Sequence, residues 1–376
     1  MNPRRDAGVD TVRAVAIGGV VLGHWLVTAI VLGPDGALRT ASPLAAVPGL
    51  RPASWLLQTL GLFFLAAGFA AAAARERRAA KTGPSDRPRV NRLRTLAGPV
   101  AALIGTLATA LTVAVFAGVP GPTLHTVAAL VTGPLWFLLP YLVLTALTGP
   151  ITRVGPVPLV AGGVAVVAVA DLGFGVLPLT LCAAWLVPFA LGVALARGRL
   201  GGRRTGWILL VGGVAAVLAL IVFAGYPDAA VGVPGDGRSN LNPPSLATVA
   251  LALAQTGAAV LVLPWLRRRA PGRTVAAVNR FALPIYLWHQ AGLVVATVAV
   301  LWLTDGRPVP GLHTGPDGGW LAVRVMWVAV AASLLVALGR AVYDLRRPQF
   351  PARPTEVIAV RDSDPPSRSR VAAHSR

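Results

Sequence analysis

Two ionisable side chains, Arg13 and His24, share one apolar segment near the start of the chain. Residues 10–32 are long and apolar enough to cross a bilayer, which takes about 20 residues. In an α-helix, the step from Arg13 to His24 closes almost three turns, so both side chains lie on one face, with Asp10 one turn below Arg13. His24 would lie about 16 Å from Arg13 along the helix axis, near the middle of the membrane. An ionisable group at that depth usually faces protein or water, where it can do acid–base chemistry or bond a neighbouring helix.

A second apolar segment, residues 275–303, is unusually polar for a membrane span. Its polar members are Asn279, Arg280, Tyr286, His289 and Gln290. A histidine here could take part in acid–base chemistry, or it could be a packed contact between helices. The sequence leaves both interpretations of His289 open.

A run of arginines lies between the second and third apolar segments. Residues 75–94 include Arg75, Arg77, Arg78, Arg89, Arg92 and Arg94. Such a cluster can hold anionic lipid beside a membrane span. It can also clamp the phosphate groups of a substrate, because the guanidinium fork binds two phosphate oxygens at once. Both interpretations can hold together.

The composition indicates a polytopic membrane protein. Of 376 residues, 55% are hydrophobic and 13% are charged, whereas a soluble domain has about 25% charged residues. We expect an all-α fold with about ten transmembrane helices. Their expected bounds are 10–33, 53–75, 95–118, 126–148, 157–172, 174–197, 205–225, 245–265, 275–303 and 319–345. Prolines in the fourth and fifth spans predict broken or re-entrant helices there.

The placement of arginine and lysine predicts the topology. If the N-terminus is cytoplasmic, 26 of the 34 basic residues fall in cytoplasmic segments and only four in outside loops. This is the positive-inside pattern, so both termini are expected in the cytoplasm. The same placement argues against nucleic acid as a partner, despite the net charge of +20. We expect a transmembrane domain over residues 1–345 and a disordered cytoplasmic tail over 346–376, which is rich in Pro, Ser and Arg.

Signatures of soluble enzymes are missing from the sequence. It contains no Gly-rich phosphate loop with Lys, no Gly-x-Ser-x-Gly, no His-Glu-x-x-His and no Cys-x-x-Cys. Cys182 is the single cysteine, so no internal disulfide can form and no metal site is predicted.

Six short motifs, taken in order, resemble those of the integral-membrane acyltransferases of the acyltransferase-3 type. They are Arg13 with Gly23-His24, Phe63-Phe64-x-x-x-Gly68-Phe69, Arg89-x-x-Arg92, Leu135-Trp136-Phe137-Leu138, Asn242-Pro243-Pro244 and Tyr286-Leu287-Trp288-His289. Each motif is weak alone, but their order and spacing over most of the chain make the likeness fairly specific. The combination with Asn-Pro-Pro is similar to an actinobacterial branch.

The resemblance implies ten helices with both ends in the cytoplasm, as the charge count does independently. It also implies that His24 and Arg13 are needed for catalysis and that Arg89 and Arg92 help bind the acyl donor. Arg75 and Arg78 fit the same Arg-x-x-Arg pattern and Arg94 lies close by, so the donor-binding arginines remain open. Possible supporting residues are Asp10, Trp136, Asn242, Tyr286 and His289.

Two departures from the family pattern matter. Ala67 stands where members usually have serine before the glycine of the second motif. The acidic partners found in members have no assured counterpart here; Asp10 and Asp35 are the nearest options.

The resemblance predicts an enzyme that moves an acyl group, by default acetyl, from cytoplasmic acyl-CoA to a hydroxyl of a carbohydrate or glycoside. His24 would be the general base, and a direct transfer and an acyl-histidine intermediate are both compatible with the residues. Acyl-CoA (acetyl-CoA) would be a co-substrate, and no cofactor is expected to be bound. The expected location is the bacterial cytoplasmic membrane.

A transporter or flippase is the alternative. Broken helices and intramembrane ionisable groups also mark transporters. Against it, no pair of matched halves is visible in the sequence.

Overall fold

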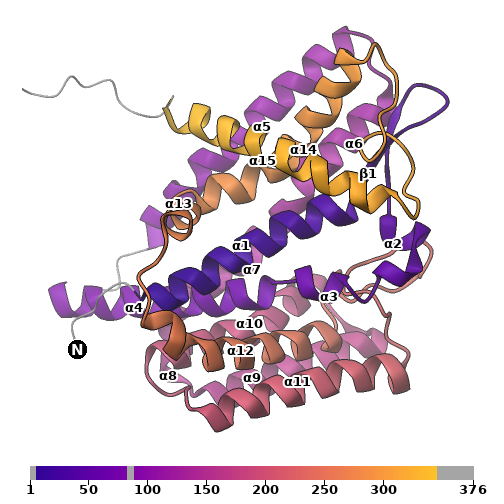
Figure 1. Cartoon of the computed structure of the whole chain (residues 1–376). Helices are drawn as coiled ribbons and strands as arrows, with labels where there is room; N and C mark the ends of the chain where they lie inside the picture. Colours follow the sequence, from indigo (N-terminus) through magenta and orange to yellow (C-terminus); the bar gives the residue numbers. More distant parts are fainter. Residues whose placement is uncertain (1–5, 83–88, 345–376) are drawn as a thin grey trace, which may run out of the picture.

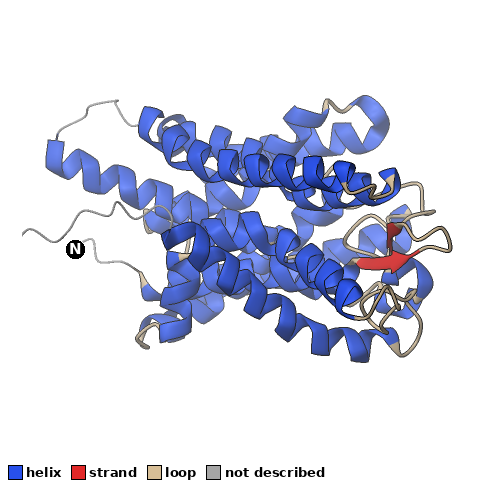
Figure 2. Ribbon diagram, turned by 90° about the horizontal axis from the view of Figure 1, so that it is seen from above, coloured by secondary structure: helices blue, strands red, loops and turns tan. Residues whose placement is uncertain are grey.

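The computed structural model describes residues 6–82 and 89–344, and almost all of its regular structure is helical (Figures 1 and 2). Among these residues, ten helical segments are long and apolar enough to cross a membrane. They are Ala7–Val27, Ser54–Ala80, Leu96–Phe116, Gly121–Ala146, Pro156–Phe174, Leu177–Ala196, Arg203–Ala224, Leu246–Arg267, Ala282–Leu303 and Trp320–Ala337. The predicted all-α fold with ten spans is confirmed. The expected tail, residues 346–376, lies outside the described residues.

Short helices and turns of other types interrupt the long helices. The α-helices are α1 (Ala7–Val27), α2 (Pro43–Ala46), α3 (Ser54–Leu57), α4 (Leu60–Thr82), α5 (Arg89–Phe116), α6 (Gly121–Thr132), α7 (Leu138–Ala146), α8 (Thr148–Arg153), α9 (Pro156–Val169), α10 (Leu177–Ala196), α11 (Arg203–Ala224), α12 (Leu246–Arg267), α13 (Arg273–Arg280), α14 (Ala282–Leu303) and α15 (Trp320–Asp344). The 3₁₀ turns are η1 (Pro48–Leu50) and η2 (Gly133–Phe137), and η3 (Ala170–Phe174) is a π-helical turn.

Helix α1 runs through the middle of the bundle. Figure 1 shows α5, α6, α14 and α15 on one side of it and α4, α10, α12, α9 and α11 on the other. It contacts α4, α12, α13, α14 and α15. In contrast, α5 and α11 expose most of their apolar side chains, among them Phe116 and Phe223 at 87% each. Apolar spans with so little protein contact must face lipid, whereas α1 has other helices on both sides (Figure 1).

The first span ends earlier than predicted. Helix α1 stops at Val27, and the apolar residues after it form strand β1 (Ala29–Leu32), which pairs antiparallel with β2 (Leu38–Ala41). The predicted bound of residue 33 was therefore wrong. A short apolar run reads alike as helix or buried strand, and here Pro34 and Gly36 supply the turn that lets it fold back. Figure 2 shows this hairpin at one end of the bundle.

Three other spans are broken. Gln58 and Thr59 separate α3 from α4, Phe281 separates α13 from α14, and η2 interrupts the fourth span at Pro134. The prediction of a broken fourth span is confirmed. The ninth span, predicted as one helix over 275–303, is two, because Phe281 leaves the helical conformation. Non-helical backbone at membrane depth is tolerated where protein surrounds it, so these breaks mark the interior of the bundle.

Close packing of α4 on α10 depends on two glycines. A Cβ on Gly68 would overlap the carbonyl oxygen of Phe189, and one on Gly192 would overlap that of Leu65. Small residues let helix backbones approach closely, which is how membrane helices associate without a hydrophobic driving force.

Candidate functional site

His24 lies in the last turn of α1, and α14 presents the polar groups that meet it. Nε2 of Gln290 lies 3.4 Å from Nδ1 of His24, and the His24 and His289 ring centroids are 5.0 Å apart. His24 is partly exposed, whereas His289 is fully buried. His289 is seven residues after the start of α14, so the two imidazoles lie within the membrane-spanning part of the bundle.

The ring orientation of His289 is set by its own helix. Its Nδ1 lies 2.7 Å from the carbonyl oxygen of Tyr286. A carbonyl only accepts, so Nδ1 carries the proton and Nε2 of the neutral ring carries a lone pair. That Nε2 is buried and has no hydrogen-bond partner in the described part of the chain. The side chain oxygen of Gln290 is buried and without a partner there too.

Hydrogen bonds to the backbone hold this pair of helices in place. The Trp25 indole N–H donates to the His289 carbonyl at 2.9 Å. The Tyr286 hydroxyl donates to the carbonyl of Pro134, at the break in the fourth span. Tyr286 was predicted as a supporting residue, and its ring lies 6.0 Å from that of His289. It therefore connects the broken fourth span to the imidazole pair.

Arg324 is an anchor that sequence reasoning left without a role. It is 1% exposed, and its guanidinium donates to the carbonyls of Trp25 (2.9 Å), Thr28 (2.9 Å) and Gly311 (3.2 Å). Two of these carbonyls belong to the end of α1, where helical carbonyls lack partners and the dipole favours a cation. The signal was present in the sequence, since an ionisable residue inside an apolar span is a functional candidate by default.

His313 lies in the loop between α14 and α15, which bonds strand β1 of the hairpin, and its role differs from that of His24 and His289. Nδ1 of His313 accepts from the Val309 N–H at 3.1 Å, and its Nε2–H donates to the Thr297 carbonyl at 2.8 Å. Burial lowers the pKa of His313. Both of its nitrogens are used in structure, so it has no free atom for chemistry.

Arg13 stands on α1 away from His24. It is partly exposed, and its side chain makes no hydrogen bond or ion pair with residues 6–82 or 89–344. Eleven residues separate it from His24, so about 16 Å of helix lies between the two side chains. Arg13 therefore does not contact the imidazole pair. The Asn279 amide donates to the Asp10 carbonyl at 2.7 Å, which ties this half of α1 to α13.

The predicted donor-binding arginines lie near one end of the bundle. Arg75 extends along the start of α8, where a Cβ on Gly149 would lie 3.3 Å from its guanidinium. Arg78 is exposed at the end of α4. Arg89, Arg92 and Arg94 begin α5, but their side chains lie outside the described part of the structure.

Asn242 and Asp35 are not brought to the site. Asn242 is exposed, and Asn240, two residues earlier, is the one fully buried. Asp35 forms an exposed ion pair with Arg39 at 2.6 Å, and the Arg39 hydrogen bonds hold the pKa of its carboxyl below the usual range. Trp136 lies instead among other aromatic side chains, with its ring 6.3 Å from that of Phe137 and 6.5 Å from that of Trp185.

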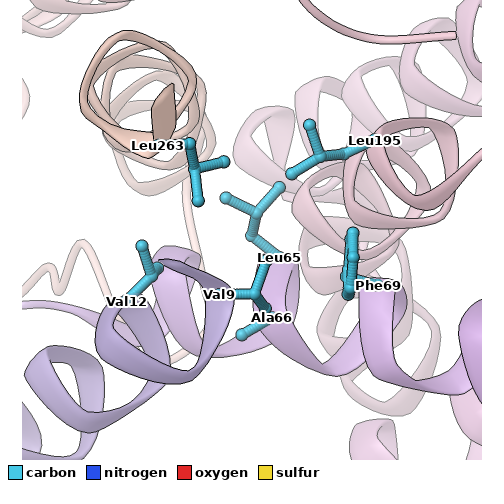
Figure 3. A pocket seen from close by; sticks show the side chains of 7 residues that line it. All are labelled: Val9, Val12, Leu65, Ala66, Phe69, Leu195 and Leu263. Atoms are coloured by element: carbon cyan, nitrogen blue, oxygen red, sulfur yellow. The ribbon is translucent and has the colours of Figure 1, made fainter. Parts of the chain in front are cut away.

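An apolar pocket lies between α1, α4, α10 and α12 (Figure 3). The side chains that line it are Val9, Val12, Leu65, Ala66, Phe69, Leu195 and Leu263. None of them has a polar side chain atom, so this pocket offers a substrate no side chain hydrogen bond. Within residues 6–82 and 89–344, no group of three or more His, Cys, Asp or Glu side chains could hold a metal ion.

Together these features define a multi-pass membrane protein with a buried imidazole pair between its first and ninth spans. The profile of the acyltransferase-3 family, described as an acyltransferase domain, matches residues 6–339. The chain belongs to this family and is an acyltransferase, as its motifs predicted. Comparisons with curated proteins and with solved structures gave no match.

Proposed function

We propose that this acyltransferase moves an acyl group, by default acetyl, from acyl-CoA to a hydroxyl of a carbohydrate or glycoside, with His24 as the general base. The observation that carries the proposal is the partly exposed residue His24, whose ring lies 5.0 Å from that of the fully buried His289, in a chain of an acyltransferase family. The hydroxyl oxygen attacks the thioester carbonyl carbon and the carbon–sulfur bond breaks. The hydroxyl proton passes to His24 and then to the leaving thiolate.

The arginines support a cytoplasmic donor. The positive-inside distribution favours a cytoplasmic start of α1 and end of α4, in a bacterial inner membrane. Arg13, Arg75 and Arg78 then lie toward the side on which acyl-CoA is found. The unpaired guanidinium of Arg13 is available to a donor phosphate, and the donor's long pantetheine arm would carry the thioester on toward His24. Arg89, Arg92 and Arg94 extend the same basic surface along the sequence.

Mass spectrometry of cell-surface glycans and secreted glycosides tests the proposal. We compare a strain lacking the gene with strains that carry the wild-type and His24→Ala forms. Loss of one acyl mass in both the deletion and His24→Ala would support the proposal and identify acceptor and acyl chain. Loss in the deletion alone would contradict it. The control is His125→Gln, since His125 lies on α6, is exposed and is outside the site; its protein level and acylation should stay near wild type.

Arg13 has a separate test. Replacing it with Gln removes the charge from a partly exposed side chain that has no hydrogen-bond or ion-pair partner in residues 6–82 and 89–344, so the fold should be retained. If it binds the donor phosphates, the KM for acetyl-CoA should rise roughly tenfold, the loss of about 1.4 kcal/mol of binding. Thiol release from acetyl-CoA by membranes of the expressing cells measures this. An unchanged KM would exclude Arg13 from the donor site.

A further inference from the structure

The His24 ring has one hydrogen-bond partner in the described chain, and it is an amide. Nε2 of Gln290 lies 3.4 Å from Nδ1 of His24, on the side of the ring that faces α14. In this orientation the amide N–H donates, so Nδ1 of His24 holds a lone pair and the proton of the neutral ring is on Nε2. That tautomer gives Nε2 no lone pair with which to act as a base.

This orientation leaves the other end of the Gln290 amide without a hydrogen bond. Its Oε1 is buried and has no partner within the described residues, and the whole side chain is only 3% exposed. Rotating the terminal amide by half a turn exchanges oxygen and nitrogen at almost no change in shape. Oε1 then faces Nδ1 and accepts its proton, and Nε2 of His24 is left with the lone pair.

When His24 is protonated, only one of the two orientations of the Gln290 amide is favourable. Once the ring has taken a proton from an acceptor hydroxyl, both of its nitrogens carry hydrogen. An amide N–H facing Nδ1 would then place two donors against each other, whereas Oε1 would accept from the charged ring. Among the described residues no carboxylate contacts His24, so the acceptor at Nδ1 has to be this amide.

We propose that Gln290 is the positioning residue of the site: its side chain oxygen accepts Nδ1–H of His24, fixes the reactive tautomer and directs Nε2 to the acceptor hydroxyl. The inference rests on the proposed role of His24 in acyl transfer. Gln290 does here what a carboxylate or amide does beside the histidine of many hydrolases, where the third group orients the base. Gln290 follows the last motif residue, and its part in the site depends on the packing of α14 against α1.

Two variants of Gln290 separate the effect of its hydrogen-bond acceptor oxygen from the effect of its side chain size. Gln290→Leu removes the acceptor and keeps a side chain of similar size. Gln290→Glu keeps an acceptor oxygen and cannot donate when ionised. Gln255→Leu is the matched control, because Gln255 also lies in a span with a buried, unpartnered Oε1, but it bonds Gln58 and not His24.

The tautomer is read by ¹⁵N NMR of histidine-labelled protein in detergent, with His24 assigned by its loss in His24→Ala. The chain has five histidines, and His313 and His289 serve as internal references with protons on Nε2 and Nδ1. We expect His24 to carry its proton on Nδ1 in the wild type, in Gln290→Glu and in Gln255→Leu. In Gln290→Leu it should move to Nε2.

Thiol release from acetyl-CoA by membranes of the expressing cells gives the activity. Loss of an orienting partner costs about 10- to 100-fold, so Gln290→Leu should fall by this factor while Gln290→Glu and Gln255→Leu retain most turnover. A proton on Nε2 in the wild type, or an unchanged tautomer in Gln290→Leu, would overturn the inference. Retained acylation in His24→Ala would instead overturn the proposed function and leave the tautomer result as it stands. If Gln290→Leu does not fold, the wild-type and Gln290→Glu spectra still decide.

Discussion

Polar groups are buried in two regions of this molecule, and the two treat their hydrogen bonds differently. In the Asn240 cluster, which consists of Pro227, Ala229, Asn240 and Ser245, the Asn240 amide donates to the carbonyls of Pro227 and Ala229, both at 2.8 Å, and its oxygen accepts from the Ser245 hydroxyl at 2.9 Å. In the imidazole pair, Nε2 of His289 and Oε1 of Gln290 have no partner in the part of the chain described.

This difference makes the imidazole pair a candidate for chemistry, although Gln58 Nε2 and Gln255 Oε1 are also buried without a partner in the described residues. An unpartnered buried polar atom costs about 1–3 kcal/mol, so a site with two of them in one small region is expensive unless a substrate uses them. In the Asn240 cluster, every polar side chain atom of Asn240 is bonded and holds the loop before α12. At the imidazole pair, His289 Nε2 and Gln290 Oε1 remain without a hydrogen bond in the described residues. Histidines show the same contrast, since His313 has both nitrogens bonded and His289 only one.

The largest effect is expected at His289. His289→Asn can still donate to the Tyr286 carbonyl through its amide, as Nδ1–H does, but it has no atom at the position of Nε2. If the open Nε2 binds the hydroxyl or assists His24, turnover should fall about 10²- to 10⁴-fold, the range for a positioned acid–base group. Thiol release from acetyl-CoA measures it.

His289→Gln provides the comparison, because its longer amide reaches toward the position of Nε2 and should recover part of the activity. Near wild-type turnover in His289→Asn would mean that the open nitrogen is not used, and the contrast between the two regions would lose its functional meaning.

Arg324 lies beside the imidazole pair, because it holds the end of α1, next to His24, to the loop before α15. Arg324→Met keeps much of the packing and leaves three carbonyls without their donor, so we expect about 1–3 kcal/mol of destabilisation for each carbonyl that stays buried and unbonded. Thermal unfolding in detergent would show a lower Tm, and His24 would lose its fixed position. Arg324→Lys keeps one charged donor, so its Tm should lie between those of the wild type and Arg324→Met. A Tm like that of wild type in Arg324→Met would exclude the anchor role.

Much of this arrangement is visible in the sequence. Ten spans, the break at Pro134 and the close approach at Gly68 follow from hydropathy, proline and small residues. His24 and His289 stand out because ionisable groups in apolar spans are rare. These features depend on local composition, which is why a single sequence reveals them.

Features set by tertiary packing were missed. Residues 28–33 continue the apolar run of α1, and only pairing with residues 38–41 makes them a strand. Asn240 and Asn242 are two residues apart with the same side chain, so nothing local says which one is buried. Gln290 and Arg324 owe their roles to contacts with α1, about 270 and 300 positions away in the chain.

Asn240 tests the region in which every polar side chain atom of that residue is hydrogen-bonded. Asn240→Ala leaves two backbone carbonyls without their donor and the Ser245 hydroxyl without its acceptor, at a cost of about 1–3 kcal/mol. We expect a lower Tm in detergent but unchanged turnover per folded molecule. Asn242→Ala is the matched control, since Asn242 is exposed and should change neither quantity. A loss of turnover in Asn240→Ala without loss of stability would move this loop into the catalytic site.

Tyr226 gives the smallest effect and a pH signature. Its hydroxyl donates to Asp171 at 2.6 Å, and the same Asp171 oxygen accepts from the Leu246 N–H at the start of α12. Burial, followed by the bond to Asp171, raises the pKa of Tyr226 to about 12. A pKa above the ordinary value of about 10 means that the fold favours the neutral phenol. The stabilisation is therefore complete below pH 10 and is lost as the pH rises toward 12.

Tyr226→Phe should cost about 1 kcal/mol at neutral pH, seen as a small drop in Tm, and should remove one late-titrating phenol from the absorbance titration. A Tyr226 that ionises near pH 10 would show that this cluster is open to solvent, which would weaken the contrast with the imidazole pair.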